Sequence, residues 1–431
     1  MMKLSLLFLA LTLGGTGLKS FAGGYEKAVG WSGQWSSLGG AAGAAASGAD
    51  ALYFNPAGLI HGPSRELSVN LSPTWSTFEG PNTPTEGQSE TSERALSPMM
   101  GLLYKQGLNV MGKDFSLGVG FYGVGGTNVT YENVKFNDDV TRPKIESDLK
   151  IVEASLGLSW AHSENLSFGV SWRMLDVSAE IQASNALAGG NNVLTVGFKD
   201  LKDTQHSGFR IGAQYMSDDK RWGTGLSLRN SVGFKLEGQS EGALSSGTTD
   251  IPAPGGDLTL ESALPLQASV GFFYKKSNGG TFFQETTYTA YSENEKITAT
   301  GDDIAFPALL GGPQPPPTVT QNWKDQWSLK LGYEDSLPWR DLTYRVGYVV
   351  TTAVTPEDHA RATRTPPGTG HTLTAGVGKE LGEGKYAMDL GLEYSMASGD
   401  GQTSEMTGIQ RAEGKFSANA YALHGSFKYR F

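Results

Sequence analysis

Residues 421–431, YALHGSFKYRF, end the chain in a regular alternation. Every second residue from Tyr421 onward is aromatic or aliphatic, with Gly425 among them, while the residues between are alanine or polar. Successive side chains of a β-strand point to opposite faces, so this stretch predicts a strand with one apolar and one polar face. The final residue, Phe431, belongs to the apolar face.

The same alternation recurs along most of the chain. Residues 152–160 and 166–174, for example, place apolar residues on one parity and Ser, Gly or charged residues on the other. Fourteen strands are predicted, near residues 66–78, 95–104, 115–131, 149–161, 166–182, 204–216, 222–237, 265–275, 281–297, 326–333, 342–351, 371–379, 386–396 and 416–431.

The connections between these strands alternate in length. The long, polar ones are expected at residues 79–94, 132–148, 183–203, 238–264, 298–325, 352–370 and 397–415. Outer-membrane barrels have an even number of strands, short periplasmic turns and long outer loops. A soluble β-sandwich also alternates along its strands, but it has no reason to alternate its loops. The predicted fold class is therefore all-β, a 14-stranded antiparallel transmembrane β-barrel, with a secreted β-sandwich as the alternative.

The composition agrees with a barrel and excludes several other classes. Charged residues make up only 18% of the chain, against about 25% in ordinary soluble domains, and no Cys is present for a disulfide scaffold. A net charge of −10 argues against a nucleic-acid binder. No motif places a catalytic triad, a carboxylate pair or a metal-ligand spacing. We therefore predict no enzyme activity, no metal site and no cofactor.

The first residues are predicted to be an export signal. Lys3 supplies a positive charge, and residues 4–13 form an apolar core of about ten residues, which is too short to span a bilayer. Small residues at Ser20 and Ala22 place the cleavage site after about Ala22. A buried N-terminal helix is the alternative interpretation.

Residues 23–65 differ from the rest because they show no clean alternation. They contain the small-residue run GGAAGAAA at 39–46 together with Trp31 and Trp35. Ala favours short helices, and Gly permits close packing and sharp turns. We expect this segment to be a hatch that fills the lumen of a barrel formed by residues 66–431. An exposed periplasmic leader is the alternative, but such a leader would gain nothing from its aromatic residues.

One stretch in this segment resembles a known family. Residues 49–59, ADALYFNPAGL, look like the hatch motif of the FadL/TodX family, with Asn55, Pro56 and Ala57 at its core just before the first strand. Further segments resemble the family's glycine-rich third strand, a Leu-Pro strand start and a late-strand signature: residues 117–125, 264–271 and 345–348. The resemblance covers essentially the whole mature chain.

This resemblance implies a function in the outer membrane of a Gram-negative bacterium. The family carries long-chain fatty acids and other hydrophobic compounds through a hatch-plugged barrel by passive diffusion, with lateral exit at a kink of the third strand. Here Gly123, Gly125 and Gly126 fall within the predicted third strand. Glycine inside a strand marks bulges and bends, so we expect the kink and the lateral opening at these residues. The identity of the ligand, fatty acid or neutral hydrocarbon, stays open.

Several cations are expected to face the lumen because of their parity: Arg173, Arg210, Arg229, Lys330 and Arg345. A cation in an apolar pocket can bind a carboxylate head group through charge-assisted hydrogen bonds. The alternative is an ion-pair network with lumenal carboxylates such as Glu153, Asp389 and Glu393.

The expected partners are a hydrophobic ligand, outer-membrane lipid and the barrel-assembly machinery, and the expected state is a monomer that binds no nucleic acid. The alternative function is a non-transporting surface protein, an adhesin or phage receptor that uses the long loops. A hatch and a kinked strand favour transport because an adhesin needs neither.

The terminal strand generates a prediction about assembly. It ends in alternating aromatics, which resembles the signal read by the barrel-assembly machinery. Deleting Phe431, or the change Phe431→Asp, should therefore reduce the amount of heat-modifiable barrel in outer-membrane fractions. An undiminished amount would contradict this role.

Overall fold

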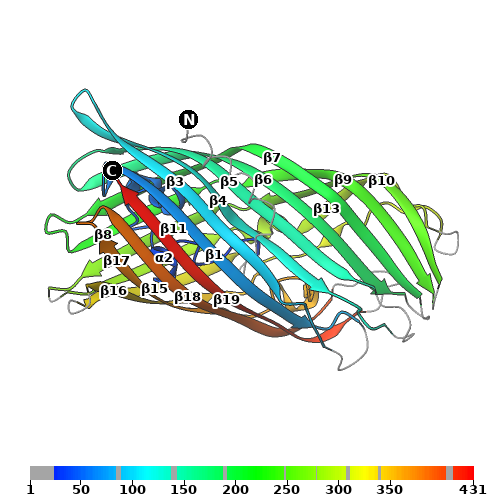
Figure 1. Ribbon diagram of the computed structural model, residues 1–431. Coiled ribbons are helices and arrows are strands. Elements are labelled where there is room, and N and C mark those ends of the chain that lie inside the picture. Colours follow the sequence, from blue (N-terminus) through cyan, green and yellow to red (C-terminus); the bar gives the residue numbers. More distant parts are fainter. Residues whose placement is uncertain are drawn as a thin grey trace.

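The computed structural model describes residues 24–431 apart from 84–88, 137–142, 188–191, 247–248, 278, 307–310, 338–340 and 404–410. The predicted export signal, residues 1–22, lies outside the described residues. Figure 1 shows a single elongated barrel whose short turns gather at the end that carries the C-terminus.

Three short helices precede a chain made almost entirely of strands. In order, the elements are α2 (Gly33–Ser36), α3 (Ala51–Phe54), η1 (Pro56–Ile60), β1 (Arg65–Gly80), β2 (Glu90–Thr91), β3 (Ala95–Val110), β4 (Lys113–Tyr131), β5 (Ile145–Ala161), β6 (Leu166–Ala186), β7 (Asn192–Met216), β8 (Trp222–Arg229), β9 (Val232–Ser246), β10 (Thr249–Leu264), β11 (Gln267–Lys275), β12 (Thr281–Thr289), η2 (Tyr291–Asn294), β13 (Lys296–Gly301), β14 (Val319–Thr320), β15 (Gln326–Leu337), β16 (Leu342–Thr351), η5 (Glu357–His359), β17 (Gly370–Leu381), β18 (Tyr386–Gln402) and β19 (Glu413–Arg430).

Within the described residues these strands build a closed wall of fourteen antiparallel strands. Three wall strands are each divided into two elements: β8 with β9, β10 with β11, and β12 with β13. β1 pairs with β19, with Glu66 opposite Arg430, and this pairing closes the barrel. The predicted all-β, 14-stranded barrel is confirmed. No helix of the described residues is long and apolar enough to cross a membrane.

The three divided strands are neighbours, and they break side by side. Arg229 at the end of β8 is opposite Gln267 at the start of β11, which is opposite Thr289 at the end of β12. Pro265 helps to set the break between β10 and β11, because proline has no N–H for a ladder hydrogen bond. The breaks lie at the level where the apolar face of the wall strands changes from the outer to the inner side of the barrel.

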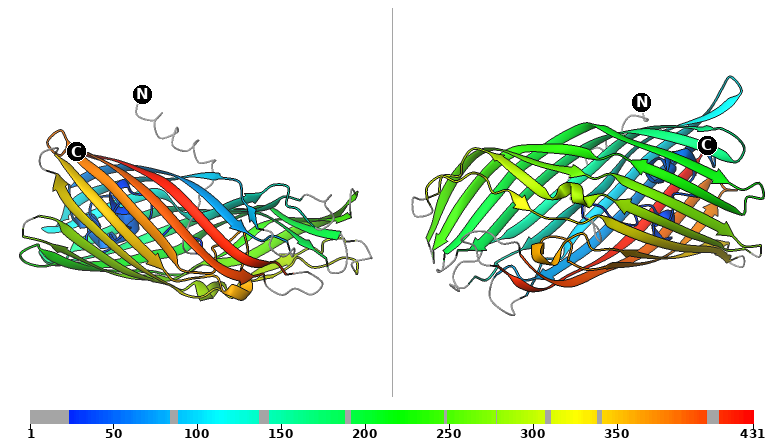
Figure 2. Two further views of the ribbon diagram at one scale, coloured as in Figure 1. Left: turned by 90° about the horizontal axis from the view of Figure 1, so that it is seen from below. Right: turned by 180° about the vertical axis from the view of Figure 1, so that it is seen from behind.

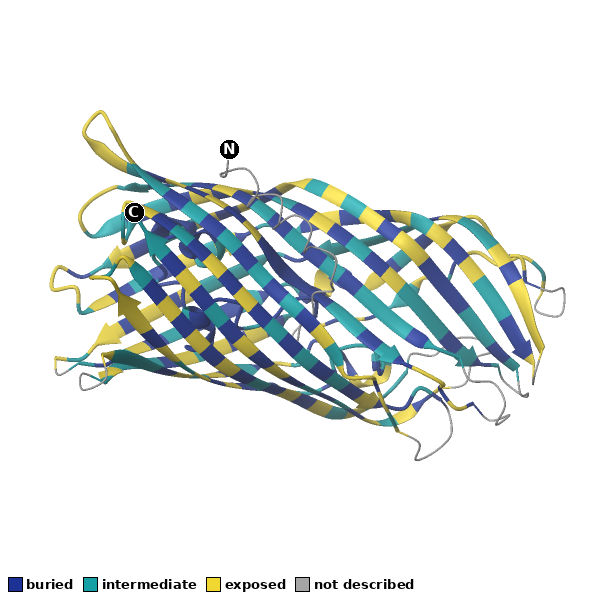
Figure 3. Ribbon diagram, in the orientation of Figure 1, coloured by how far each residue is buried: buried dark blue, intermediate teal, exposed yellow. Residues whose placement is uncertain are grey.

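At this level the apolar face of the strands changes sides. We call the half of the barrel with the short turns and the C-terminus the lower half, and the other the upper half. In the lower half of β6, Val170 and Trp172 are exposed outward while Arg173 is buried inward. In the upper half, Leu175 is buried inward and Glu180 is exposed outward. Figure 3 shows the alternation of buried and exposed residues along the wall strands. A lipid-facing band needs apolar residues outside, so the lower half matches a membrane span. The upper half has a polar exterior and an apolar lumen.

The change of side explains two wrong predictions. Residues 183–203 and 238–264 were expected to be long polar loops, but most of them form the upper parts of β7, β9 and β10. Their outward positions are polar, as Lys235 and Glu237 are, while Phe234 and Leu236 are buried inward. The expectation treated polar sequence as loop because it assumed that outward residues are apolar along the whole strand.

Residues 24–64, called the hatch below, lie inside the lower half of the barrel (Figure 2, blue). Trp31, Leu38 and Leu52 of the hatch are fully buried. Glycines on the inner face of the wall leave room for it: a Cβ at Gly225 would lie 2.1 Å from the carbonyl oxygen of Gly43. The inward glycines of the alternating pattern are therefore contact points for the hatch.

The change of side can be tested with two substitutions of the same parity on β6. Val170→Arg should lower the free energy of unfolding by about 2–4 kcal/mol, because it places a cation in the hydrocarbon. Glu180→Arg, ten residues further along the strand, should change it little because that position faces water. Denaturant titration of the barrel in lipid vesicles measures both. Equal losses would contradict a membrane band confined to the lower half.

Candidate functional site

The predicted hatch motif connects the hatch to two wall strands. Nδ2 of the fully buried Asn55 donates to the carbonyl oxygen of Gly43 at 2.7 Å and lies 3.2 Å from the carbonyl oxygens of Ala213 on β7 and Leu226 on β8. Its Oδ1 accepts from the N–H of Ala57 at 3.2 Å and so caps η1. One side chain thus satisfies backbone groups of the hatch and of the wall.

Pro56 follows as the first residue of η1, where its missing N–H costs nothing. The wall is shaped to receive this turn: a Cβ at Gly212 would lie 1.9 Å from Oδ1 of Asn55, and one at Gly169 would lie 2.3 Å from the carbonyl carbon of Pro56. The motif and its two wall glycines form one fitted contact.

The predicted kink region is a place where the wall lacks backbone pairing. The β3–β4 ladder runs from Val110 opposite Lys113 to Gly101 opposite Tyr122 and stops there. Beyond it, β3 pairs with β1 and β4 pairs with β5, with a register shift between Gly123 and Gly125. Residues 95–100 of β3 and 123–129 of β4 therefore do not pair with each other, and we call this gap between the two strands the window.

The first residues of the hatch lie in the window. Gly126 donates its N–H to the carbonyl oxygen of Tyr25 at 2.8 Å, and Glu26 forms a β-bridge with Gly125. A Cβ at Gly125 would lie 1.9 Å from that carbonyl oxygen, and Gly126 has a φ of 148°, which other residues rarely adopt. Both glycines are therefore needed for the hatch to close the window in this way.

Four of the five predicted lumenal cations form ion pairs with carboxylates. Arg173 binds Glu153 through Nε at 2.8 Å and Nη2 at 2.6 Å, and both side chains are fully buried. Arg229 binds Glu26 of the hatch, with Nη2 2.6 Å from Oε2. The pairs of the other two are Lys330 with Glu285 at 2.8 Å, and Arg345 with Asp389 at 2.7 Å and Glu334 at 2.6 Å.

The fifth cation, Arg210, contacts the hatch instead. Its Nη1 donates to the carbonyl oxygen of Leu52 at 3.2 Å, and its guanidinium lies 5.3 Å from the ring centre of Tyr53. The geometry brings Arg173, Arg210 and Arg229 into one charged layer on neighbouring strands, directly below the change of side. Whether any of the five contacts a ligand head group stays a prediction.

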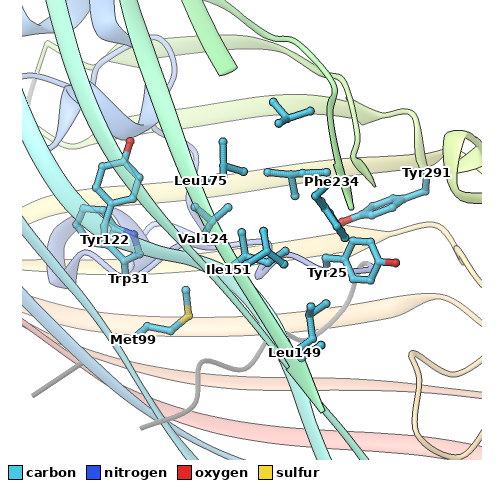
Figure 4. Close-up of a cluster of buried hydrophobic side chains, with 14 of the residues drawn as sticks. Tyr25, Trp31, Met99, Tyr122, Val124, Leu149, Ile151, Leu175, Phe234 and Tyr291 are labelled. Atoms are coloured by element: carbon cyan, nitrogen blue, oxygen red, sulfur yellow. The ribbon is translucent and has the colours of Figure 1, made fainter. Parts of the chain in front are cut away.

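Above this layer lies an apolar pocket. Its lining includes Leu149 of β5, Phe234 and Leu236 of β9, Ile297 of β13 and Trp323. Tyr25 closes it from the hatch side: its ring lies 5.0 Å from that of Trp323, and its hydroxyl is 2.9 Å from Oγ of Ser262. Figure 4 shows Tyr25, Tyr291 and Phe234 gathered at this place, with Ile151 and Val124 beside them.

A cation that sequence reasoning missed lies on the wall of this pocket. Arg364 belongs to the segment between β16 and β17, and its guanidinium lies 5.6 Å from the ring centre of Trp323. Among the described residues no carboxylate lies within 4.0 Å of it. Burial lowers the pKa of Arg364, and Tyr25 raises it in part. The side chain stays a cation at neutral pH because the unperturbed value is so high.

Residues 352–370 were predicted as an outer loop, and no strand-like alternation indicates that they line the lumen. Arg361 also lines the outer continuation of the pocket, with Pro317 and Phe198, and burial lowers its pKa to about 10. The available signal for a lumenal cation was the pair of arginines at 361 and 364, which no acidic residue follows between Asp358 and Gly370.

The hatch contact generates a prediction about local stability. Asn55→Ala leaves buried carbonyl groups without their donor, which costs about 1–3 kcal/mol. Backbone amides of residues 41–46 and 55–60 should then exchange faster with deuterium, as measured by mass spectrometry, while the barrel stays heat-resistant. Asn109→Ala, at the exposed end of β3, is the matched control. Unchanged exchange in the hatch would show that Asn55 does not hold it.

The overall structure is similar to several solved barrels. A Pseudomonas aeruginosa FadL homologue matches with a TM-score of 0.74 at 16% identity, over 95% of this chain and 100% of that chain. The P. putida toluene transporter TodX matches with a TM-score of 0.72 at 16% identity (94% and 99%), and the Ralstonia pickettii toluene transporter TbuX with 0.66 at 16% identity (94% and 99%). Identities this low show the fold alone. No significant match was found among curated protein sequences.

The family comparison extends beyond the fold. The model of the family described as outer membrane protein transport protein (OMPP1/FadL/TodX) matches residues 19–431. Its members are transport channels of the Gram-negative outer membrane and not enzymes. The barrel, the plugged lumen and this match over nearly the whole length lead to one conclusion: the chain belongs to the OMPP1/FadL/TodX family of outer-membrane transporters for hydrophobic compounds.

Proposed function

We propose that the protein carries long-chain fatty acids, or hydrophobic molecules with a similar acidic head, from the outer mouth of the barrel to the window. The observation that carries this proposal is the coincidence of three features at one level of the wall: the end of the apolar lumen, the charged layer and the window. Tyr122, where β3–β4 pairing stops, is opposite Glu153 and donates to it at 2.5 Å.

An axial route is unfavourable for an apolar solute. Below the pocket it meets the buried pairs of Glu153 with Arg173 and of Glu26 with Arg229. Separating such a pair leaves an uncompensated buried charge, which costs about 3–5 kcal/mol. The window lies at the same level and opens toward the outward apolar surface that ends at Phe121. Lateral exit keeps the solute out of both water and the charged layer.

The closed structure supports gating by the hatch. The pocket beneath Arg364 holds about 40 Å³, whereas pockets for small-molecule ligands enclose roughly 300–1,000 Å³. A ligand therefore needs Tyr25 to move, and Tyr25 is part of the segment that closes the window. One displacement of the first hatch residues would enlarge the pocket and open the wall.

Arg364 is the residue that we expect to bind the head group of the ligand. A guanidinium in an apolar pocket, with no carboxylate within 4.0 Å among the described residues, is suited to a carboxylate ligand. Four of the five predicted cations are less suited because they already bind carboxylates. The fifth, Arg210, already donates to the carbonyl oxygen of Leu52 in the hatch. A neutral hydrocarbon would gain no charge-assisted hydrogen bond from Arg364, so the proposal favours the fatty acid of the two alternatives.

The experiment compares uptake of labelled oleate and of its methyl ester by cells. Arg364→Leu should raise the oleate concentration for half-maximal uptake by about tenfold or more, since a hydrogen bond to a charged group contributes about 1.5–3 kcal/mol. Uptake of the ester, which lacks the charge, should not change. Arg411→Leu, at an exposed arginine, is the matched control.

Two outcomes would contradict the proposal. Wild-type cells that take up neither compound faster than cells without the protein would remove the transport function. Equal effects of Arg364→Leu on oleate and on the ester would remove the carboxylate contact and leave transport of neutral hydrophobic molecules.

A further inference from the structure

The lipid-facing wall carries a hollow that shares no residue with the pocket under Arg364 or with the window. It is an open depression of about 510 Å³ on the outer face of β11, β12, β15 and β16. Its rim is aromatic and aliphatic: Phe272, Phe282, Leu331, Tyr333, Val346 and Tyr348. The opposing backbones of Gly332 and Gly347 form its floor. A hollow of this shape in the membrane band fits a hydrocarbon chain.

A cation lies at the periplasmic rim of this hollow. Nζ of Lys276, in the turn between β11 and β12, is 5.6 Å from the ring centres of both Phe282 and Tyr333. No carboxylate of the described residues lies within 4.0 Å of it, although Asp335 is within electrostatic reach. Two aromatic rings hold the ammonium over the rim, so its charge faces the head-group layer of the periplasmic leaflet.

A polar pair lies one step deeper. Gln284 is the next outward residue after Phe282 on β12, which places it about 5 Å further into the membrane for a tilted strand. Its Nε2 donates to Oγ1 of Thr286 at 2.8 Å. Its amide still has a second N–H and an oxygen for which the described residues provide no partner. An unmatched amide away from water is costly, and the ester carbonyl of a bound glycerolipid would supply the missing acceptor.

We propose that this hollow is a binding site for an anionic phospholipid of the periplasmic leaflet. The phosphate contacts Lys276, an ester carbonyl accepts from Gln284, and one acyl chain fills the hollow between Phe272 and Val346. Charge complementarity selects an anionic head group over a zwitterionic one, because Lys276 has no close carboxylate. The site is separate from the pocket and the window, and it holds whether or not the ligand of transport is a fatty acid.

The test uses the full barrel in detergent, mixed with equal amounts of phosphatidylglycerol and phosphatidylcholine that carry identical chains. Native mass spectrometry measures the fraction of protein that retains each lipid. The wild type should prefer phosphatidylglycerol. Lys276→Ala should reduce that preference about fivefold, which corresponds to the roughly 1 kcal/mol that one basic residue contributes near an anionic lipid surface.

The matched control is Lys385→Ala. Lys385 also lies over two rings, 5.9 Å from Tyr386 and 5.5 Å from Tyr429, but at a turn outside the hollow. This variant should keep the wild-type preference. A second variant, Val346→Trp, fills the hollow and should lower retention of both lipids; heat-modifiable mobility checks that each barrel is folded.

Three results would overturn the site. One is equal retention of the two lipids by the wild type. Another is an equal loss of preference in Lys276→Ala and Lys385→Ala, which would indicate a general effect of surface charge. The third is unchanged retention in a folded Val346→Trp barrel, which would show that the lipid does not occupy the hollow.

Discussion

The long wall strands, such as β5 and β6, must face hydrocarbon over one part of their length and water over the other, and the rest of the structure depends on this constraint. Because strand side chains alternate, an apolar exterior in the membrane comes with a polar interior, and a polar exterior above the membrane permits an apolar interior. The switch lies between Arg173 and Leu175 on β6 and between Glu153 and Ile151 on β5. The barrel therefore has an apolar lumen above a polar one.

The two halves of the lumen differ in what they contain. The polar half is filled by the hatch, which is held by buried polar contacts such as Asn55 with the wall carbonyls and Glu26 with Arg229. The apolar half ends in the pocket under Arg364. On the proposed route, an apolar solute that descends the upper lumen would reach the charged layer and the window together. The division of the lumen into an apolar and a polar half would favour the proposed lateral route without any contact specific to the solute.

The sequence predicted those structural features that depend on a local pattern of residues. Alternation predicted fourteen strands, and the Asn-Pro-Ala motif matched a place where Asn55 does contact the wall. It missed the upper parts of β7, β9 and β10, because their reversed alternation looks like a polar loop. It also missed Arg364 and Tyr25, since their roles depend on how a segment between strands and the first hatch residues pack in three dimensions. The hollow beside Lys276 is lined by residues of four strands, so no local sequence pattern could predict it.

The central claim is that an apolar ligand leaves the lumen at the window, and photochemical cross-linking tests it most directly. Outer-membrane vesicles that contain the wild-type protein are incubated with a long-chain fatty acid carrying a diazirine near its methyl end, irradiated and digested. Cross-links should be found by mass spectrometry in residues 95–100 and 123–129, besides the pocket. Cross-links absent from both strands of the window but present in residues 33–40 of the hatch, which pack against Asp389 and Gly332 near the short-turn ends of β18 and β15, would contradict lateral exit and indicate an axial path.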